Sequence, residues 1–316
     1  MSVPNINRLF DLYAANLSLY LPEHQGLFLC PLCFRLFSRD AIASKTLTLE
    51  HVIPSAIQGR LTTLTCVECN RRHGSLLEAN LIQRLRTEDI LAGKSKDPLR
   101  VRIQTDQGEF GANVFFSDTQ DPNIRILGIP EISNPSLHSA AHSDFEGGNP
   151  KISIEGRLGY KEVPSRVAAL RMVYLLMFRY FGYGYVLFSH ADCIREQLAS
   201  PVTDGDPLRG LLWLREPPLK NSIAILQEPA ELRCFLAILD LSTEVKRYLA
   251  VVLPGTEPNS ENVYRRLRAM PPEQLMALKP KIDFISFDEG FLSDAGYRHF
   301  PLRLWRGQAK VVSANH

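Results

Sequence analysis

Two cysteine pairs with the spacing Cys-x-x-Cys are the first residues in this chain that suggest chemistry. Cys30 and Cys33 lie in CPLC, Cys66 and Cys69 lie in CVEC, and about thirty residues separate the pairs. Each pair supplies two thiolates from one tight turn, and four thiolates complete the tetrahedral coordination of zinc. The spacing therefore predicts a structural zinc site with no position left for water or substrate. A redox pair and unliganded core cysteines are the alternatives.

An acid, two imidazoles and an amide occur in the same stretch. Glu50 and His51 lie in LEHVIP, and Asn70 and His73 follow the second cysteine pair in CNRRHGS. Carboxylate and amide oxygens suit a hard divalent ion, so Glu50 and Asn70 are candidate ligands of Mg²⁺ or Mn²⁺. An unperturbed imidazole has a pKa of about 6.5 and is partly neutral near pH 7, so His51 is then left to take a proton from an attacking water. The residues alone also allow a solvated Glu-His surface pair and an N-cap role for Asn70.

The surrounding pattern predicts a small unit that positions these groups. Residues 46–53 and 61–65 are rich in β-branched side chains and indicate two strands of a hairpin. Apolar residues then recur at helical spacing from Asn70 to about Ile90. The expected order is strand, loop, strand and helix, with one cysteine pair on each side. The second pair would draw the helix start, and Asn70 with it, beside the end of the first strand.

The combination of CPLC, LEHVIP and TCVECNRRHGS resembles the zinc-stapled ββα-metal branch of the HNH endonucleases, over residues 29–85. The resemblance implies hydrolysis of a phosphodiester bond, with products that carry a 5′ phosphate and a 3′ hydroxyl. It implies that His51 is the general base and that Glu50 and Asn70 hold one catalytic Mg²⁺ or Mn²⁺. The four cysteines would hold zinc. His73 would contact phosphate, assist the leaving group or ligate the metal, and these three roles stay open.

The chain departs from that family pattern at three positions. Thr63 stands where many members have an asparagine whose amide ties the hairpin loop that orients the catalytic histidine. Glu50 replaces the commoner aspartate, which adds one methylene to the ligand arm, and His73 stands where many relatives have lysine. The rigidity of the hairpin loop is therefore the feature that the structure must account for.

Three arginines near the candidate site are expected to contact nucleic acid. Arg60 ends the polar hairpin loop, and Arg71 and Arg72 are expected in the first turn of the helix, where free backbone amides favour anions. The alternative is that they are ordinary exposed charges. The formal net charge is only +2, which excludes a polycation that coats nucleic acid nonspecifically. Contact with nucleic acid must therefore be local, and double-stranded DNA is the expected partner.

The length of 316 residues, with 45% hydrophobic and 22% charged residues, predicts a folded α+β protein with one or two cores. The polar segment 92–98 is the best boundary, which gives an HNH ββα-metal domain over 1–95 and a larger α+β domain over 96–316. The second domain is expected to serve in targeting, sensing or binding of an activator or protein partner. No secretory pattern or membrane span is apparent, which favours the cytoplasm. The oligomeric state is not defined by the sequence.

Three segments of the second domain contain residue types that could bind metal or nucleic acid. His138 and His142 have metal-like spacing only if they are helical, and the surrounding Ser and Gly argue for a loop. The segments 264–268 (YRRLR) and 297–306 (YRHFPLRLWR) interleave basic and aromatic residues, as nucleic-acid surfaces and ordinary interfaces both do.

Taken together, the sequence predicts a metal-dependent DNA endonuclease of a restriction or anti-phage defence system. The alternatives are a non-catalytic zinc-stapled module that binds nucleic acid or regulates, and an RNA-directed nuclease.

Overall fold

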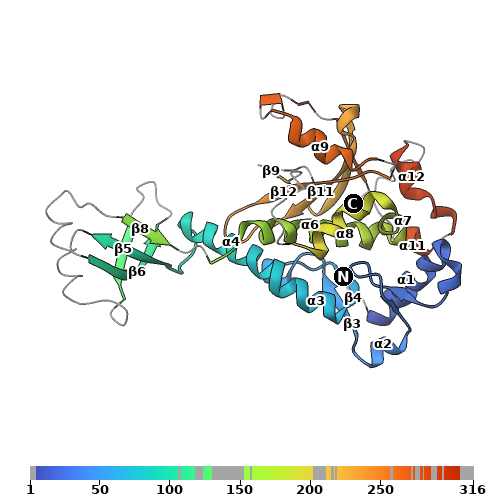
Figure 1. The fold of residues 1–316 in the computed structure, drawn as a ribbon, viewed down its shortest axis with the longest axis horizontal. Helices are drawn as coiled ribbons and strands as arrows, with labels where there is room; N and C mark the ends of the chain where they lie inside the picture. Colours follow the sequence, from blue (N-terminus) through green and yellow to red (C-terminus); the bar gives the residue numbers. More distant parts are fainter. Residues whose placement is uncertain are drawn as a thin grey trace. The chain divides into compact units, whose positions relative to one another are not determined.

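A computed structural model describes residues 5–105, 108–117, 124–129, 153–156, 159–201, 211–214, 217, 219–256, 259–271, 273–274, 278–279, 281–285, 290–293 and 295–306. In these ranges helices accompany four antiparallel sheets, so the predicted α+β class is confirmed (Figure 1). None of the described helices combines the length and the apolar character that crossing a membrane requires.

The secondary-structure elements have the following bounds. The α-helices are α1 (Ile6–Tyr20), α2 (Asp40–Ala43), α3 (Val67–His73), α4 (Ala79–Leu91), α6 (Glu162–Phe181), α7 (Tyr183–Val186), α8 (Asp192–Ala199), α9 (Asn262–Ala269), α11 (Gly290–Ser293) and α12 (Phe300–Trp305). Short helical turns are η1 (Pro22–His24), η2 (Ser55–Ile57), η5 (Ser189–Ala191), η6 (Ala230–Leu232) and η7 (Ala295–Tyr297), and η3 (Gly74–Glu78) is a π-helical turn. The strands are β1 (Phe28–Leu29), β2 (Leu36–Phe37), β3 (Leu47–His51), β4 (Thr62–Cys66), β5 (Leu99–Thr105), β6 (Gly108–Phe116), β7 (Ile124–Gly128), β8 (Ser153–Gly156), β9 (Leu211–Leu214), β10 (Ser222–Glu228), β11 (Cys234–Asp240), β12 (Tyr248–Leu253) and β13 (Lys281–Ile285).

Strands β3 and β4 form the hairpin expected from the sequence. They pair antiparallel, with Leu47 opposite Cys66 at one end and His51 opposite Thr62 at the other. All five residues of β4 are buried, which suits a β-branched strand packed on both faces. The hairpin therefore places the Glu50-His51 pair at the end of β3 and the second cysteine pair at the opposite end of β4.

The hairpin loop is held by its own backbone. The N–H of Val52 donates to the carbonyl of Leu61 at 2.9 Å, which continues the ladder one step beyond the strands. At Gly59 a Cβ atom would lie 1.8 Å from the carbonyl oxygen of Ile53, so only glycine allows this close approach. The loop that follows His51 is thus tightly folded in this region.

The helix after the hairpin begins earlier than expected. Its first residue is Val67, and Cys66 is the N-cap, with extended backbone and a sulfur that accepts the N–H of Cys69 at 3.5 Å. Asn70 therefore lies inside α3, and the N-cap alternative for it is wrong. The sequence pointed to Asn70 because asparagine is a preferred cap and a thiol is not. Helix α3 passes directly into η3 and α4, so the helical path continues to Leu91.

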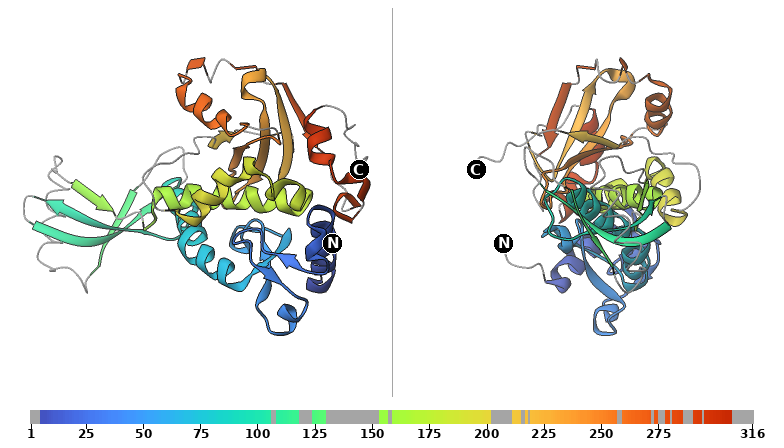
Figure 2. Two further views of the ribbon diagram at one scale, coloured as in Figure 1. Left: turned by 45° about the vertical axis from the view of Figure 1, so that its right-hand side comes forward. Right: turned by 90° about the vertical axis from the view of Figure 1, so that its left-hand side faces the viewer.

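Helix α6 is long and largely apolar, and it is buried along most of its length. A helix that is hydrophobic on all sides belongs inside a protein. Figures 1 and 2 show α6 between the N-terminal segment, drawn in blue, and the sheet drawn in orange. It contacts β4 and η3 on one side and β11 and β12 on the other. Helix α1, capped by Asn5 as its side chain accepts from Asn7, packs on β1 and β4.

The sheet next to α6 is formed in part by strands within residues 222–253. Its order is β13-β10-β11-β12-β9, and all described neighbours are antiparallel. All six residues of β12 are buried, as are the first six of β11, so this part of the sheet is covered on both faces. The apolar runs of these strands reflect that two-sided burial.

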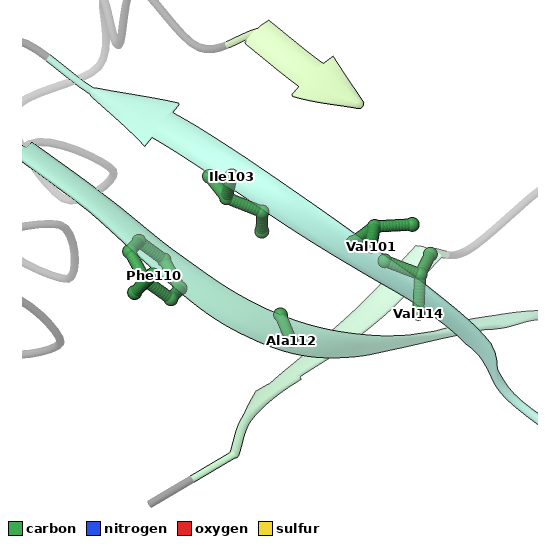
Figure 3. Close-up of a cluster of buried hydrophobic side chains, with 5 residues drawn as sticks. All are labelled: Val101, Ile103, Phe110, Ala112 and Val114. Atoms are coloured by element: carbon green, nitrogen blue, oxygen red, sulfur yellow. The ribbon is translucent and has the colours of Figure 1, made fainter. Parts of the chain in front are cut away.

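A second sheet has the order β7-β6-β5-β8 and its own small core. Five alternating side chains of β5 and β6 share one face and are buried there (Figure 3): Val101, Ile103, Phe110, Ala112 and Val114. The register places Val101 opposite Ala112 and Ile103 opposite Phe110. The alternation of apolar residues in this segment thus matches the pairing of β5 with β6.

The chain forms two compact units that do not follow its linear order. Unit 1 comprises Met1–Leu81, Glu162–Leu241 and Arg247–His316, and unit 2 comprises Ile82–Lys161 and Ser242–Lys246. The boundary expected between residues 95 and 96 lies inside unit 2. The hairpin, α3 and α6 all belong to unit 1, so the candidate site draws on residues distant in sequence. His138 and His142 lie outside the described residues.

Candidate functional site

The first cysteine pair sits on a short strand pair that the sequence did not predict. Strands β1 and β2 flank CPLC, and the turn closes where the N–H of Phe34 donates to the Cys30 carbonyl and the Cys30 N–H donates to the Arg35 carbonyl, both at 2.9 Å. Phe34 has a φ of +57°, a strained value for a bulky residue that the turn imposes. This turn holds Cys30 and Cys33 on one side.

The four cysteine sulfurs converge. The ligand atoms of Cys30, Cys33, Cys66 and Cys69 all lie within 4.8 Å of one another, and the sulfurs of Cys33 and Cys66 are 3.7 Å apart. Zinc–sulfur bonds of about 2.3 Å in a regular tetrahedron place the sulfurs about 3.8 Å apart. The cluster therefore fits a structural zinc ion. Three of these cysteines are buried and Cys33 is exposed.

Arg35 adds positive charge beside the cysteine cluster. Its Nε donates to the Cys33 sulfur and its Nη2 to the Cys66 sulfur, each at 3.5 Å, while Nη2 also pairs with Glu68 at 2.5 Å. Hydrogen bonds from the neighbouring thiols, first from Cys30, lower the pKa of Cys33, and Arg35 acts in the same direction. The arginine thus favours the thiolate form that binds metal. The sequence pattern did not indicate this role of Arg35, although Arg35 lies only two residues after Cys33.

Glu50 is buried and paired with an arginine from a distant part of the chain. Only 4% of Glu50 is exposed, and its Oε1 accepts from Nη2 of Arg171 at 2.6 Å. Arg171 lies in α6, is fully buried, and also pairs through Nη1 with Glu78 at the end of η3. Burial is the main cause that raises the pKa of Glu78, and the nearby Glu50 adds to it. Glu50, Arg171 and Glu78 are therefore a buried charge cluster that the sequence did not reveal.

His51 points away from this cluster. Successive side chains of a strand face opposite sides, so the burial of Glu50 toward α6 turns His51 to the other face of β3. His51 is only partly buried, next to its register partner Thr62. An imidazole in this position is accessible to solvent, as a base that acts on water must be.

Asn70 and His73 lie on α3 with different exposure. Asn70 is partly buried, whereas His73 is 4% exposed. Burial, followed by the charges of Arg171 and Arg72, lowers the pKa of His73 to about 4, so the ring is neutral near pH 7. Its Nδ1 has no hydrogen-bond partner among the described residues. His73 is thus positioned inside the protein in this state, and phosphate contact, leaving-group assistance and metal ligation stay predictions for it.

The donors for a catalytic divalent ion are suitable in type. Glu50 offers carboxylate oxygens and Asn70 an amide oxygen, and α3 packs against β3 and β4. Among the described residues, however, the four cysteines are the one group of three or more His, Cys, Asp or Glu side chains whose ligand atoms converge. A carboxylate has two oxygens, so an ion pair through one does not exclude a second cation. The metal role of Glu50 and Asn70 stays a prediction.

Thr63 is held from outside the hairpin. Its side chain is fully buried, and its Oγ1 lies 2.7 Å from the hydroxyl of Tyr13 in α1. Thr63 therefore ties β4 to α1. Together with the close approach at Gly59, this bond holds the hairpin in place.

The three arginines expected to contact nucleic acid lie at the surface. Arg60, Arg71 and Arg72 are exposed. Because α3 begins at Val67, Arg71 and Arg72 belong to its last turn and lie away from the free amides of its first turn, so that part of the expectation is wrong. Arg72 donates from Nη2 to the Ala199 carbonyl at 2.9 Å. Nucleic-acid contact by these residues stays a prediction.

Two aromatic residues in the basic segments near the C-terminus are buried. Tyr264 in α9 is 5% exposed and donates to the Val252 carbonyl at 3.0 Å, and Trp305 in α12 is 2% exposed. Buried rings cannot stack on nucleic-acid bases. Tyr264 and Trp305 are therefore core residues.

Comparison of the chain with protein-family models, with curated proteins and with solved structures gave no match in any of the three.

Proposed function

We propose that the protein is a metal-dependent HNH endonuclease that hydrolyses phosphodiester bonds of DNA. The observation that carries the proposal is the cysteine cluster, because it joins the turn after β1 to the junction of β4 and α3. That junction sets α3, with Asn70, against the strand that ends in His51. The order of strand, strand and helix around LEHVIP and CVECN supports the ββα-metal assignment.

In this proposal His51 is the general base. Its neutral imidazole takes a proton from a water molecule, the water oxygen attacks phosphorus, and the bond from phosphorus to the 3′ oxygen breaks. The products carry a 5′ phosphate and a 3′ hydroxyl. Glu50 and Asn70 hold the divalent ion, which when bound supplies positive charge for the transition state and the leaving oxygen.

The remaining groups have supporting roles in the proposal. The four cysteines fill the coordination of zinc, so zinc stabilises the fold and does not activate water. The exposed Arg60, Arg71 and Arg72 supply positive charge for the DNA backbone. Double-stranded DNA is the proposed substrate, and restriction or anti-phage defence is the proposed setting, with an activator or protein partner acting through the C-terminal part of the chain.

A cleavage assay tests the proposal. Zinc-loaded protein is incubated with Mg²⁺ or Mn²⁺ and with double-stranded DNA, single-stranded DNA or RNA over a range of salt. Wild type should cut double-stranded DNA fastest, and His51→Ala should abolish cutting. His24→Ala is the matched control, because His24 lies in η1, outside the hairpin and α3. If RNA is cut faster than DNA, RNA is the substrate and the DNA assignment is wrong. Equal cutting by wild type and His51→Ala would refute the mechanism.

A non-catalytic zinc-stapled module is the second candidate. The ion pair between Glu50 and Arg171 favours it, because a guanidinium already neutralises the carboxylate that the nuclease would use for metal. This candidate expects binding of nucleic acid, measured by fluorescence anisotropy, with no cleavage under any metal condition. The cleavage assay therefore separates the two functions.

A further inference from the structure

Arg171 links β3, the strand of Glu50 and His51, to η3, the turn that follows α3. It lies in α6, 121 residues from Glu50 and 93 from Glu78 along the chain. Its side chain is fully buried, and its two terminal nitrogens bind two different carboxylates. One carboxylate belongs to β3 and the other to η3.

The two partners place this contact next to the proposed chemistry. Glu50 directly precedes His51 on β3, and Glu78 ends the π-helical turn that follows α3, which carries Asn70. Holding Glu50 toward α6 fixes the rotation of the strand end, and alternation then fixes the direction of His51. Holding Glu78 fixes the turn that continues from the Asn70 helix. The single guanidinium therefore sets β3 and the α3–η3 segment relative to each other.

The chemistry of arginine suits this arrangement. A guanidinium is planar and rigid, so its two ends hold two carboxylates at a fixed separation, which a lysine ammonium on a flexible stem does not. The wider π-helical turn η3 is a geometry often associated with functional sites.

The charge balance argues against a purely stabilising role. Two carboxyl groups share one buried guanidinium, and buried ion pairs are often replaceable by apolar groups without loss of stability. A costly buried cluster at this position is better explained by the geometry that it imposes.

We propose that Arg171 is the positioning residue of the candidate catalytic site, and that α6 thereby controls the alignment of His51 with Asn70. The inference rests on the proposed nuclease function. It extends the site beyond the cysteine-bound hairpin and helix to a residue of the later part of the chain, and it gives that part a direct route to the chemistry.

The test compares Arg171→Lys with Arg179→Lys in the full zinc-loaded chain. Arg179 is also buried in α6, about two turns further along, so it controls for the loss of a buried guanidinium. Arg171→Lys keeps the charge and loses the two-ended contact. We expect kcat for DNA cleavage to fall about 100-fold, the cost of a misplacement of roughly 1 Å. Zinc content should stay that of wild type, and Arg179→Lys should keep kcat within about threefold.

Two further readouts separate positioning from partial unfolding. The Mn²⁺ concentration that gives half-maximal rate should rise at least about fivefold in Arg171→Lys, whereas an inactive fraction lowers the rate without moving this midpoint. In ¹³C-histidine spectra recorded without divalent ion or DNA, and assigned with His51→Ala, the His51 signal should shift in Arg171→Lys alone. Unchanged kcat, midpoint and His51 signal in Arg171→Lys would overturn the inference.

Glu78→Ala is the second variant and covers the case in which Arg171→Lys does not fold. It keeps the pair of Glu50 and Arg171 and removes only the contact of Arg171 to η3. We expect the same upward shift of the Mn²⁺ midpoint, and a midpoint equal to that of wild type would overturn the inference. Absence of cleavage by wild type itself would instead refute the proposed nuclease function, so the two failures are distinguishable.

Discussion

Replacement of Cys66 by serine tests the zinc assignment with little disturbance of the helix. Cys66 has two tasks: its sulfur lies in the cysteine cluster and also caps α3 by accepting the N–H of Cys69. Serine is a preferred N-cap, so Cys66→Ser keeps the cap and removes the metal ligand. A change in stability therefore reports on the metal.

The expected magnitude follows from the four-sulfur geometry. Structural zinc contributes about 10–16 kcal/mol in zinc-finger peptides, or roughly 2.5–4 kcal/mol for each of four ligands. For a compact unit of this size, 1 kcal/mol shifts the melting temperature by about 2–4 °C. Cys66→Ser should therefore lower Tm by roughly 10 °C.

The assay combines zinc content per chain with thermal unfolding followed by circular dichroism. Wild type should contain about one zinc per chain with four sulfur ligands in X-ray absorption, and a strong chelator should lower its Tm. Cys193→Ser, which alters a cysteine of α8 outside the cluster, should leave zinc content and Tm unchanged. The zinc assignment is refuted by a Cys66→Ser protein with full zinc content and the Tm of wild type.

Two further predictions concern the supports of the site. Tyr13→Phe and Thr63→Val should each cost about 1–3 kcal/mol in urea unfolding, because each removes the hydrogen bond between two buried hydroxyl groups. The double variant should cost less than the sum, and strict additivity would argue against the bond. The pKa of His73 is about 4 in the folded protein and about 6.5 when unfolded. The contribution of His73 to the free energy of unfolding is therefore present above pH 6.5 and is lost as pH falls toward 4. Between pH 7 and pH 4 wild type should lose about 3 kcal/mol more than His73→Gln, and equal losses would contradict the buried neutral ring.

The local features of the site could be predicted because neighbouring residues encode them. Alternating β-branched residues around TLTLEHVI and LTTLT are enough to indicate the hairpin. Two cysteine pairs are enough to indicate four converging sulfurs, because zinc sites use this spacing. In each case the signal lies within a few residues of the feature.

The features that the sequence did not indicate depend on an unusual local cap and on a tertiary contact. The start of α3 depends on the Cys66 sulfur as a cap for the N–H of Cys69, a use that thiols rarely have. The position of Glu50 depends on Arg171, which is remote in the chain. One sequence signal was nevertheless present, since a charged residue within an apolar helix needs a partner when it is buried. The identity of that partner could come only from the fold.

The central claim is that His51 activates water for hydrolysis of DNA, and the most direct measurement is single-turnover cleavage in water enriched in ¹⁸O. Zinc-loaded wild type with Mn²⁺ should produce fragments whose 5′ phosphate contains one ¹⁸O atom. The His51→Ala variant, at equal zinc content, should produce no labelled fragments. Equal release by both proteins, or none by wild type on any nucleic acid, would contradict the account.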